Sequence, residues 1–231
     1  NALEAIFRQG DVNHVTGDSH YLAIFLCARK TVVTIHDCVM MSRLRGAKRF
    51  FYWLFWLWLP TKRASIVVTV SNKSQTELQG FVSIAPNKLR IIPNGISNEF
   101  TYQAPEKNKR NSRNLLQIGT GPNKNLERII AALNGLQCHL TIIGTPSEPQ
   151  IQLLHLHHVQ YTIKSGLDRN QIVDEYRACD ALLFLSTYEG FGLPILEANA
   201  VGRAVITSNI EPMLEVAGPS GFFIDPNDIE Q

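Results

Sequence analysis

Short apolar runs rich in Val, Ile and Leu alternate with longer amphipathic runs along this chain. Short apolar runs bounded by turn residues are typical of buried strands, and apolar positions three and four apart are typical of helices. The predicted strands are 12–15, 31–37, 65–70, 88–92, 114–119, 138–144, 159–163, 181–186, 203–208 and 221–225, and the predicted helices are 3–8, 22–30, 72–80, 126–133, 147–158, 168–180, 193–202 and 211–218. This alternation predicts parallel sheets with helices on both faces.

A polar segment, Ser97–Asn114, interrupts the alternation and predicts a domain boundary or surface loop. Residues 1–95 hold 12 basic and 5 acidic side chains, and residues 96–231 hold 10 and 15, so the two parts carry +7 and −5. The asymmetry favours two units with different partners, the first facing an anionic surface, although a chance distribution stays open. We predict two doubly wound α/β domains, 1–95 and 96–231.

Composition narrows the class of protein. The chain is 45% hydrophobic and 18% charged over 231 residues, which excludes a disordered or collagen-like chain. Its four cysteines lie scattered without a CxxC spacing, so we expect reduced, buried thiols and a cytoplasmic protein rather than a disulfide-stapled one.

Phe50–Leu59 is a run of ten apolar residues that is too short to span a membrane. As a helix rising about 1.5 Å per residue, it covers only about half of a ~30 Å hydrocarbon layer. Basic residues flank it, namely Arg43, Arg45, Lys48, Arg49, Lys62 and Arg63. Two interpretations stay open: a core helix that ends at Pro60, or peripheral contact of residues 43–63 with an anionic membrane.

The segment Leu185–Ala200 is the most informative part of the chain. A predicted strand leads into the loop 189–192, and Pro194 is expected as the first residue of a helix. Backbone amides at such a helix start form an anion site suited to phosphate. Glu189 and Glu197 would repel phosphate unless they face neutral hydroxyls, such as those of a sugar and a ribose. The segment therefore indicates a nucleotide sugar; the alternative is a solvated Glu189 and a Glu197 that complements the helix dipole.

The pattern SxxEGFGLPxLEA at 186–198, followed by GRAVITS at 202–208, closely resembles the donor-site signature of the retaining family-four (group 1) glycosyltransferases. Those enzymes have the GT-B fold of two facing Rossmann-like domains. VVTIHD, VVTVS and IIPNGI resemble the later part of the family's N-terminal domain. The resemblance implies an α/β protein of the GT-B type. Residues 1–95 would be the C-terminal part of an incomplete acceptor-side domain, and 96–231 the donor-binding domain.

The resemblance assigns roles around the EGFGLP motif. It implies that Glu189 lies near the donor sugar and that Glu197 holds the ribose hydroxyls. It also implies that the loop backbone contacts the sugar and the phosphates. The residues of that loop are Gly190, Phe191, Gly192 and Leu193.

Three further residues are implied. Lys124 in GPNKN matches the basic residue that binds the diphosphate, where a cation neutralises charge that develops on the leaving group. His36 matches an N-domain histidine that reaches the donor sugar. Thr120 stands where many relatives carry a second basic ligand. A solvated turn lysine and a structural histidine remain the alternatives for Lys124 and His36.

The resemblance implies a retaining glycosyltransferase that transfers a sugar from a nucleoside diphosphate sugar to a glycan or lipid-linked acceptor. We expect it in surface polysaccharide or lipopolysaccharide biosynthesis, in the cytoplasm at the inner face of the membrane. The chain shows no Asp-x-Asp pattern, so no metal and no cofactor is expected, and no nucleic-acid module is recognisable. The alternatives are a GT-B-type nucleotide-sugar epimerase and a nonenzymatic nucleotide-binding module or fragment.

Overall fold

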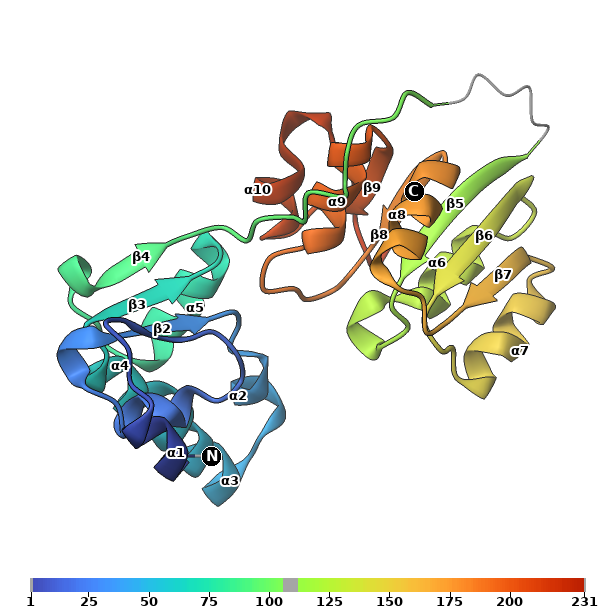
Figure 1. Cartoon of the computed structure of the whole chain (residues 1–231). Helices are drawn as coiled ribbons and strands as arrows, with labels where there is room; N and C mark the ends of the chain where they lie inside the picture. Colours follow the sequence, from blue (N-terminus) through green and yellow to red (C-terminus); the bar gives the residue numbers. More distant parts are fainter. Residues whose placement is uncertain (1, 106–111, 231) are drawn as a thin grey trace. The chain divides into compact units, whose positions relative to one another are not determined.

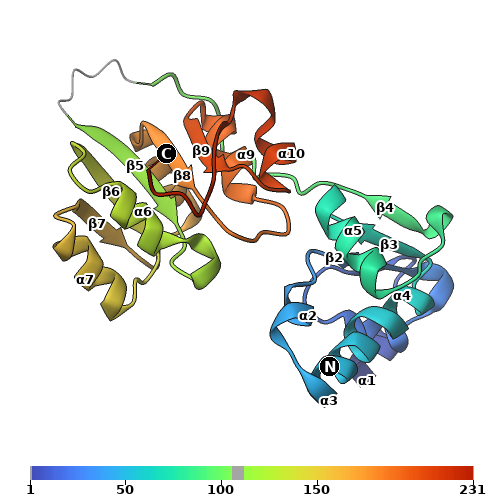
Figure 2. The same ribbon diagram turned by 180° about the vertical axis from the view of Figure 1, so that it is seen from behind.

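The computed structural model describes residues 2–105 and 112–230, and Figures 1 and 2 show it from two sides. The chain divides into two compact units, Asn1–Asn94 (unit 1) and Gly95–Gln231 (unit 2). This division lies one residue from the boundary that the sequence predicted. Each unit has its own parallel sheet.

Unit 1 has a four-stranded sheet in the order β1-β2-β3-β4 among the described residues. Its strands are β1 Asn13–Val15, β2 Thr31–Ile35, β3 Ile66–Thr69 and β4 Leu89–Ile91. Its helices are α1 Ala2–Phe7, η1 His20–Ile24, η2 Ala28–Lys30, α2 Val39–Arg43, α3 Gly46–Tyr52, η3 Trp53–Trp58, α4 Leu59–Arg63, α5 Asn72–Phe81 and η4 Pro86–Lys88. Neighbouring strands in the described part of this sheet are also consecutive in the sequence, so the strand order does not reverse there.

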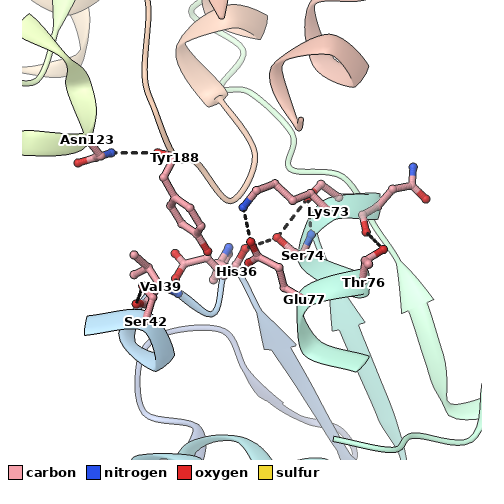
Figure 3. Close-up of polar contacts among 12 residues, drawn as sticks. His36, Val39, Ser42, Lys73, Ser74, Thr76, Glu77, Asn123 and Tyr188 are labelled. Atoms are coloured by element: carbon pink, nitrogen blue, oxygen red, sulfur yellow. Dashed lines mark hydrogen bonds and ion pairs between the residues drawn. The ribbon is translucent and has the colours of Figure 1, made fainter. Parts of the chain in front are cut away.

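The sheet of unit 1 is held by one apolar cluster and by polar caps. Val33 and Val67 on the central strands pack against Leu57 of η3 and Leu78 of α5, and each of the four is fully buried. Ser71 is the N-cap of α5, because its hydroxyl accepts the Ser74 N–H. Figure 3 shows the first turns of α5, where Lys73 pairs with Glu77 and the Ser74 hydroxyl donates to the His36 carbonyl.

Unit 2 has a six-stranded sheet in the order β10-β9-β8-β5-β6-β7 among the described residues. Its strands are β5 Arg113–Ile118, β6 Cys138–Ile143, β7 Gln160–Lys164, β8 Ala181–Phe184, β9 Ala204–Ser208 and β10 Phe222–Ile224. Its helices are η5 Pro122–Lys124, α6 Leu126–Ala132, α7 Glu148–Leu156, α8 Arg169–Ala178, α9 Leu193–Val201, α10 Met213–Ala217 and η6 Gly218–Ser220. The chain runs outward from β5 to β7 and then returns to β8, so this sheet is doubly wound as expected.

Alternate residues of the central strands of unit 2 face opposite cores. On β8, Leu182 and Phe184 join the cluster formed by α8, α9 and α10, whereas Leu183 joins the cluster formed by α6 and α7. Figures 1 and 2 show α8 and α9 on one face of the sheet and α6 on the other. The strand period of two thus accounts for the nearly continuous apolar runs in the sequence.

The segment 95–105 belongs to unit 2, although its polar composition predicted a boundary or surface loop. Phe100 is only 8% exposed and packs edge-on against Tyr176. The N–H of Gln103 donates to the Val201 carbonyl, and the buried Arg203 guanidinium donates to the Gln103 carbonyl. These contacts are why the unit boundary precedes Ser97. The rest of the predicted boundary segment falls partly on residues 106–111, which lie outside the described residues.

Two helix predictions in unit 1 are wrong in part. Residues 22–30 form short 3-10 turns rather than one α-helix. His20, Ala23 and Leu26 are buried at a spacing of three, which is the period of a 3-10 helix. The aromatic run does enter the core, but it continues through a π-helical segment and past the buried Pro60, where α4 extends to Arg63.

All four cysteines are free, and three of them are buried as expected. Burial raises the pKa of the Cys38 and Cys179 thiols to about 12. Cys27 is exposed, which differs from the prediction that all the thiols are buried. Within the described residues, none of the helices has the length and apolarity needed to cross a membrane.

Candidate functional site

The candidate site lies at the carboxyl edge of the unit 2 sheet, where the strand order reverses between β5 and β8. The chain leaves these adjacent strands in different directions, because β5 leads to α6 on one face and β8 leads to α9 on the other. Doubly wound sheets bind ligands in the crevice that forms at such a switch point. The two loops at this point, 119–125 and 185–192, contain Lys124 and Glu189.

The loop after β5 is shaped by residues that tolerate unusual backbone angles. Gly119 has φ +86°, and a Cβ atom there would lie 3.0 Å from Cε of Lys124. Glycine therefore lets the lysine side chain lie close against the backbone. Asn125 follows with φ +61°, and its Nδ2 donates to the Pro226 carbonyl at 2.6 Å. These two points fix the short η5 turn that carries Lys124.

Hydrogen bonds join the two loops directly. The N–H of Thr187 donates to the Asn123 carbonyl at 2.9 Å. Asn123 Nδ2 donates in turn to the Tyr188 carbonyl at 3.1 Å, a contact that Figure 3 draws, and to Glu189 Oε1 at 3.3 Å. The loops after β5 and β8 are thereby held as one polar surface.

Lys124 and Glu189 form an ion pair at the centre of this surface. Lys124 Nζ lies 2.7 Å from Glu189 Oε1, and the two side chains are 21% and 16% exposed. The Phe184 ring centroid is 4.7 Å from the same Nζ, which adds a cation–π contact. The structure therefore brings together two of the predicted site residues, 65 positions apart in the sequence.

The glycine loop after Glu189 leads into α9 through a left-handed residue. Gly192 is the N-cap of α9 with φ +103°, and a Cβ atom there would lie 3.3 Å from the Ile195 side chain. Phe191 is 6% exposed, so its side chain belongs to the core and only its backbone can serve a ligand. Pro194 is the second helical residue, one position later than predicted. The amides at 190–193 precede or open the helix at the edge that carries the ion pair.

Glu197 lies one turn inside α9 and is half-buried. The Tyr176 hydroxyl donates to its Oε2 at 2.5 Å. Burial raises the pKa of Glu197, while the Tyr176 hydrogen bond and the charge of Arg169 act in the opposite direction. Among the described residues, Tyr176 is the one hydrogen-bonding partner of this carboxylate. Glu197 is thus separately held and does not belong to the Lys124–Glu189 pair.

Thr120 follows β5, as predicted, but its hydroxyl is already engaged. Its Oγ1 donates to the Thr145 carbonyl at 2.9 Å, and its own carbonyl accepts the Gln150 amide at 3.0 Å. A hydroxyl whose hydrogen is engaged in this way can only accept further hydrogen bonds, and an ionised diphosphate has no hydrogen to donate. A role for Thr120 would require the hydroxyl to rotate.

His36 belongs to unit 1, where it follows β2 and is exposed. Its Nε2 donates to the Thr16 carbonyl at 2.8 Å. Its assignment to the donor site stays a prediction. In the part of the chain that the structure describes, no group of three or more His, Cys, Asp or Glu side chains is arranged to hold a metal ion.

Sequence reasoning missed three residues that shape the site. Asn123 binds the Tyr188 carbonyl and Glu189, Phe184 lies against Lys124, and Tyr176 binds Glu197. Asn123 could have been suspected because it adjoins Lys124 in the same turn. Phe184 and Tyr176 sit within ordinary strand and helix patterns, so no local signal marks them.

Comparisons with known proteins agree across both units. Residues 100–231 match the model of glycosyl transferases group 1, and residues 1–100 match that of glycosyltransferase family 4. The chain is 26% identical over 230 residues to the serotype-specific mannosyltransferase WbdA of Escherichia coli, covering 87% of this chain and 28% of that protein. It is 24% identical over 236 residues to the O-antigen chain mannosyltransferase RfbU of Salmonella typhimurium, covering 98% and 65%.

Solved structures show the same fold. Sucrose-phosphate synthase from Thermosynechococcus elongatus superposes with a TM-score of 0.77 at 20% identity, covering 95% of this chain and 61% of that one. Anabaena HepE, crystallised with UDP and glucose, gives a TM-score of 0.76 at 17% identity, covering 99% and 68%. The expected α/β fold of the GT-B type is confirmed. The chain spans less than two thirds of the length of these curated relatives.

Proposed function

This chain belongs to the group 1 glycosyl transferases, and on that premise we propose that it serves the transfer of a sugar from a nucleoside diphosphate sugar to an acceptor hydroxyl. The transfer would retain the configuration at the anomeric carbon and would serve surface polysaccharide or lipopolysaccharide biosynthesis. The names of its relatives support this, since they include O-antigen mannosyltransferases. No observation favours the epimerase or the nonenzymatic binding module.

The ion pair at the β5–β8 switch point is the observation that carries the proposal. Lys124 Nζ is the cation at this crevice that a diphosphate would meet, and the amides at 190–193 would bind further phosphate or sugar oxygens. Glu189 would turn from Lys124 to the hydroxyls of the donor sugar, and Glu197 would accept from the ribose. When the glycosidic bond breaks, Lys124 would stabilise the charge on the leaving diphosphate. The leaving phosphate would then help to deprotonate the acceptor hydroxyl on the same face.

The remaining assignments belong to the same proposal. His36 would reach the donor sugar and Thr120 would approach the diphosphate after rotation of its hydroxyl. The donor is a nucleoside diphosphate sugar, which agrees with the crystallisation of the structural neighbour HepE in complex with UDP-glucose. The acceptor would be a glycan or a lipid-linked glycan, and one relative is named for a diphosphoundecaprenol substrate. Transfer would need neither a metal nor another cofactor.

We include in the proposal a cytoplasmic location with peripheral contact of residues 43–63 to the inner face of an anionic membrane. In the sequence no Asp or Glu occurs between Asp37 and Glu77, so this stretch carries positive charge alone. Phe50, Phe51 and Phe55 are 54%, 55% and 38% exposed, although the same run buries Leu57. Exposed aromatic rings beside cations suit an interface that contains acidic lipids.

Vesicle sedimentation tests this contact. We expect the protein to bind vesicles of phosphatidylcholine with phosphatidylglycerol, and to bind pure phosphatidylcholine weakly. The double variant Phe50→Ser/Phe51→Ser should lose most of the binding. Phe222→Ser removes a slightly more exposed ring from unit 2 (63% exposed) and is the control. Equal binding by the double variant, the control and the unchanged protein would refute the membrane contact.

Substitution of the ion pair tests the function. In the whole enzyme, Glu189→Gln and Lys124→Ala should each lower sugar transfer from the donor by at least about 100-fold, the usual scale for losing an electrostatic group at a reacting centre. Glu175→Gln is the matched control, because Glu175 has the same 16% exposure and pairs with Lys164. Unchanged transfer in the Glu189 and Lys124 variants would defeat the assignment.

A further inference from the structure

Tyr176 carries a hydroxyl group at a position where an apolar side chain would satisfy the packing. The residue is fully buried, and its ring lies edge-on to Phe100 with centroids 5.5 Å apart. Phenylalanine would fill the same volume without a hydroxyl group that needs a partner. The partner of that hydroxyl is Glu197, which lies on the next helix along the chain. The hydroxyl therefore has a specific task at Glu197 beyond filling the core.

We propose that Tyr176 is the positioning residue for Glu197, holding Oε2 so that Oε1 alone is presented to the ribose of the bound nucleotide. The inference rests on the proposed role of Glu197. The contact is short, at 2.5 Å, and joins the last turn of α8 to the middle of α9. Both helices pack into one core through neighbours such as Val173, Ile195 and Ala198. A carboxylate fixed at one oxygen by a rigid donor keeps a single orientation.

The electrostatics of the pair support the same role. Burial disfavours the charged form of Glu197, and the hydrogen bond from Tyr176 favours it. A charged carboxylate accepts hydrogen bonds from ribose hydroxyls more strongly than a neutral acid does. Tyr176 thus supports both the orientation and the charge that ribose binding needs. Among the described residues, no second donor reaches Glu197 that could replace it.

Nucleotides with and without ribose hydroxyls separate this role from general stability. The probes are UDP and GDP with their 2′,3′-dideoxy forms, and the pair whose ribonucleotide binds the protein more tightly is used. Calorimetry gives the ratio of the Kd of the dideoxy form to that of the ribonucleotide. This ratio is independent of the active fraction, because both ligands are measured on one preparation. The variants are Tyr176→Phe and Glu197→Gln. Tyr161→Phe, which loses a hydroxyl contact to His155 elsewhere in unit 2, is the control.

We expect Tyr176→Phe to lower the ratio by roughly 3- to 10-fold, as for the loss of one hydrogen bond, and to leave binding of the dideoxy form unchanged. Tyr161→Phe should leave the ratio unchanged. A ratio that falls in Glu197→Gln but stays constant in Tyr176→Phe would overturn the positioning role alone. A ratio that stays constant in Glu197→Gln would overturn the proposed role of Glu197, and this inference with it.

Discussion

Because Lys124 and Glu189 are paired, the substitution Glu189→Gln should change nucleotide binding and sugar transfer in opposite directions. A diphosphate that reaches Lys124 must compete with a carboxylate 2.7 Å away. Glu189→Gln removes that competition and also removes a negative charge beside the phosphates. It should therefore tighten the binding of the nucleoside diphosphate while it lowers transfer by at least about 100-fold, because the sugar loses its charged ligand.

The magnitude follows from the exposure of the pair. Both side chains are about one fifth exposed, so solvent screens the pair in part and its strength is about 1 kcal/mol. Its removal should raise the affinity for UDP or GDP about 5-fold. Lys124→Ala should act in the opposite direction, because charge-assisted hydrogen bonds to phosphate contribute about 1.5–3 kcal/mol, or roughly 10- to 150-fold in Kd.

Isothermal titration with UDP and GDP measures both effects, and a donor transfer assay on the same preparations gives the activity. Glu175→Gln, the matched control, should change neither quantity. Weaker nucleotide binding in Glu189→Gln would refute the competition argument, since general damage to the site lowers binding and transfer together. Unchanged nucleotide binding in Lys124→Ala would refute the placement of the diphosphate.

Three further outcomes test the backbone and the buried polar groups. Gly192→Ala should destabilise unit 2 by about 1–2 kcal/mol, visible as a lower Tm, because φ is +103° there; Gly80→Ala, in a helix with open space around it, should raise stability slightly. Burial lowers the pKa of His20 below 6.5, where its Nδ1 donates to the Trp56 carbonyl. The unfolded state then binds more protons, so the Tm of unit 1 should fall as the pH falls below about 6.5, and His20→Gln should flatten that slope. Arg203→Met should destabilise unit 2 by about 3 kcal/mol, visible as a strongly lowered Tm, because several carbonyls lose a buried charged donor. An unchanged Tm in any of these tests would contradict its reasoning.

The strands were predictable because their signal is local. Each predicted strand overlaps a parallel strand of the structure. On β8 the alternation of Leu182, Leu183 and Phe184 between two cores explains why the run lacks polar residues. Helix caps depend on equally local contacts, since the Asp168 side chain caps α8 by accepting the N–H of Gln171. These features depend on a few neighbouring residues and on elementary geometry.

The predictions that were wrong or incomplete concern residues whose contacts are distant in the sequence. Residues 97–105 have the composition of a linker, but Phe100 packs edge-on against Tyr176 and the Gln103 carbonyl accepts a hydrogen bond from Arg203. Pro60 does not end its helix, because it lies near the start of α4 and its buried ring follows a π-helical turn. At the site, Lys124 and Glu189 were assigned by resemblance. Their direct pairing and the hydrogen bond from the Tyr176 hydroxyl to Glu197 could be seen only in the structure. Sequence therefore identified the chemistry of the loops and the structure supplied the partners.

A crystal structure of the protein with UDP or GDP bound would show whether the β5–β8 switch point holds the nucleotide. We expect phosphate oxygens within hydrogen-bonding distance, about 3 Å, of Lys124 Nζ and of the amides at 190–193. We also expect the ribose to contact Glu197 Oε1 and the Lys124–Glu189 contact to be broken or lengthened. A nucleotide bound elsewhere, with the ion pair intact and the start of α9 unliganded, would contradict this placement.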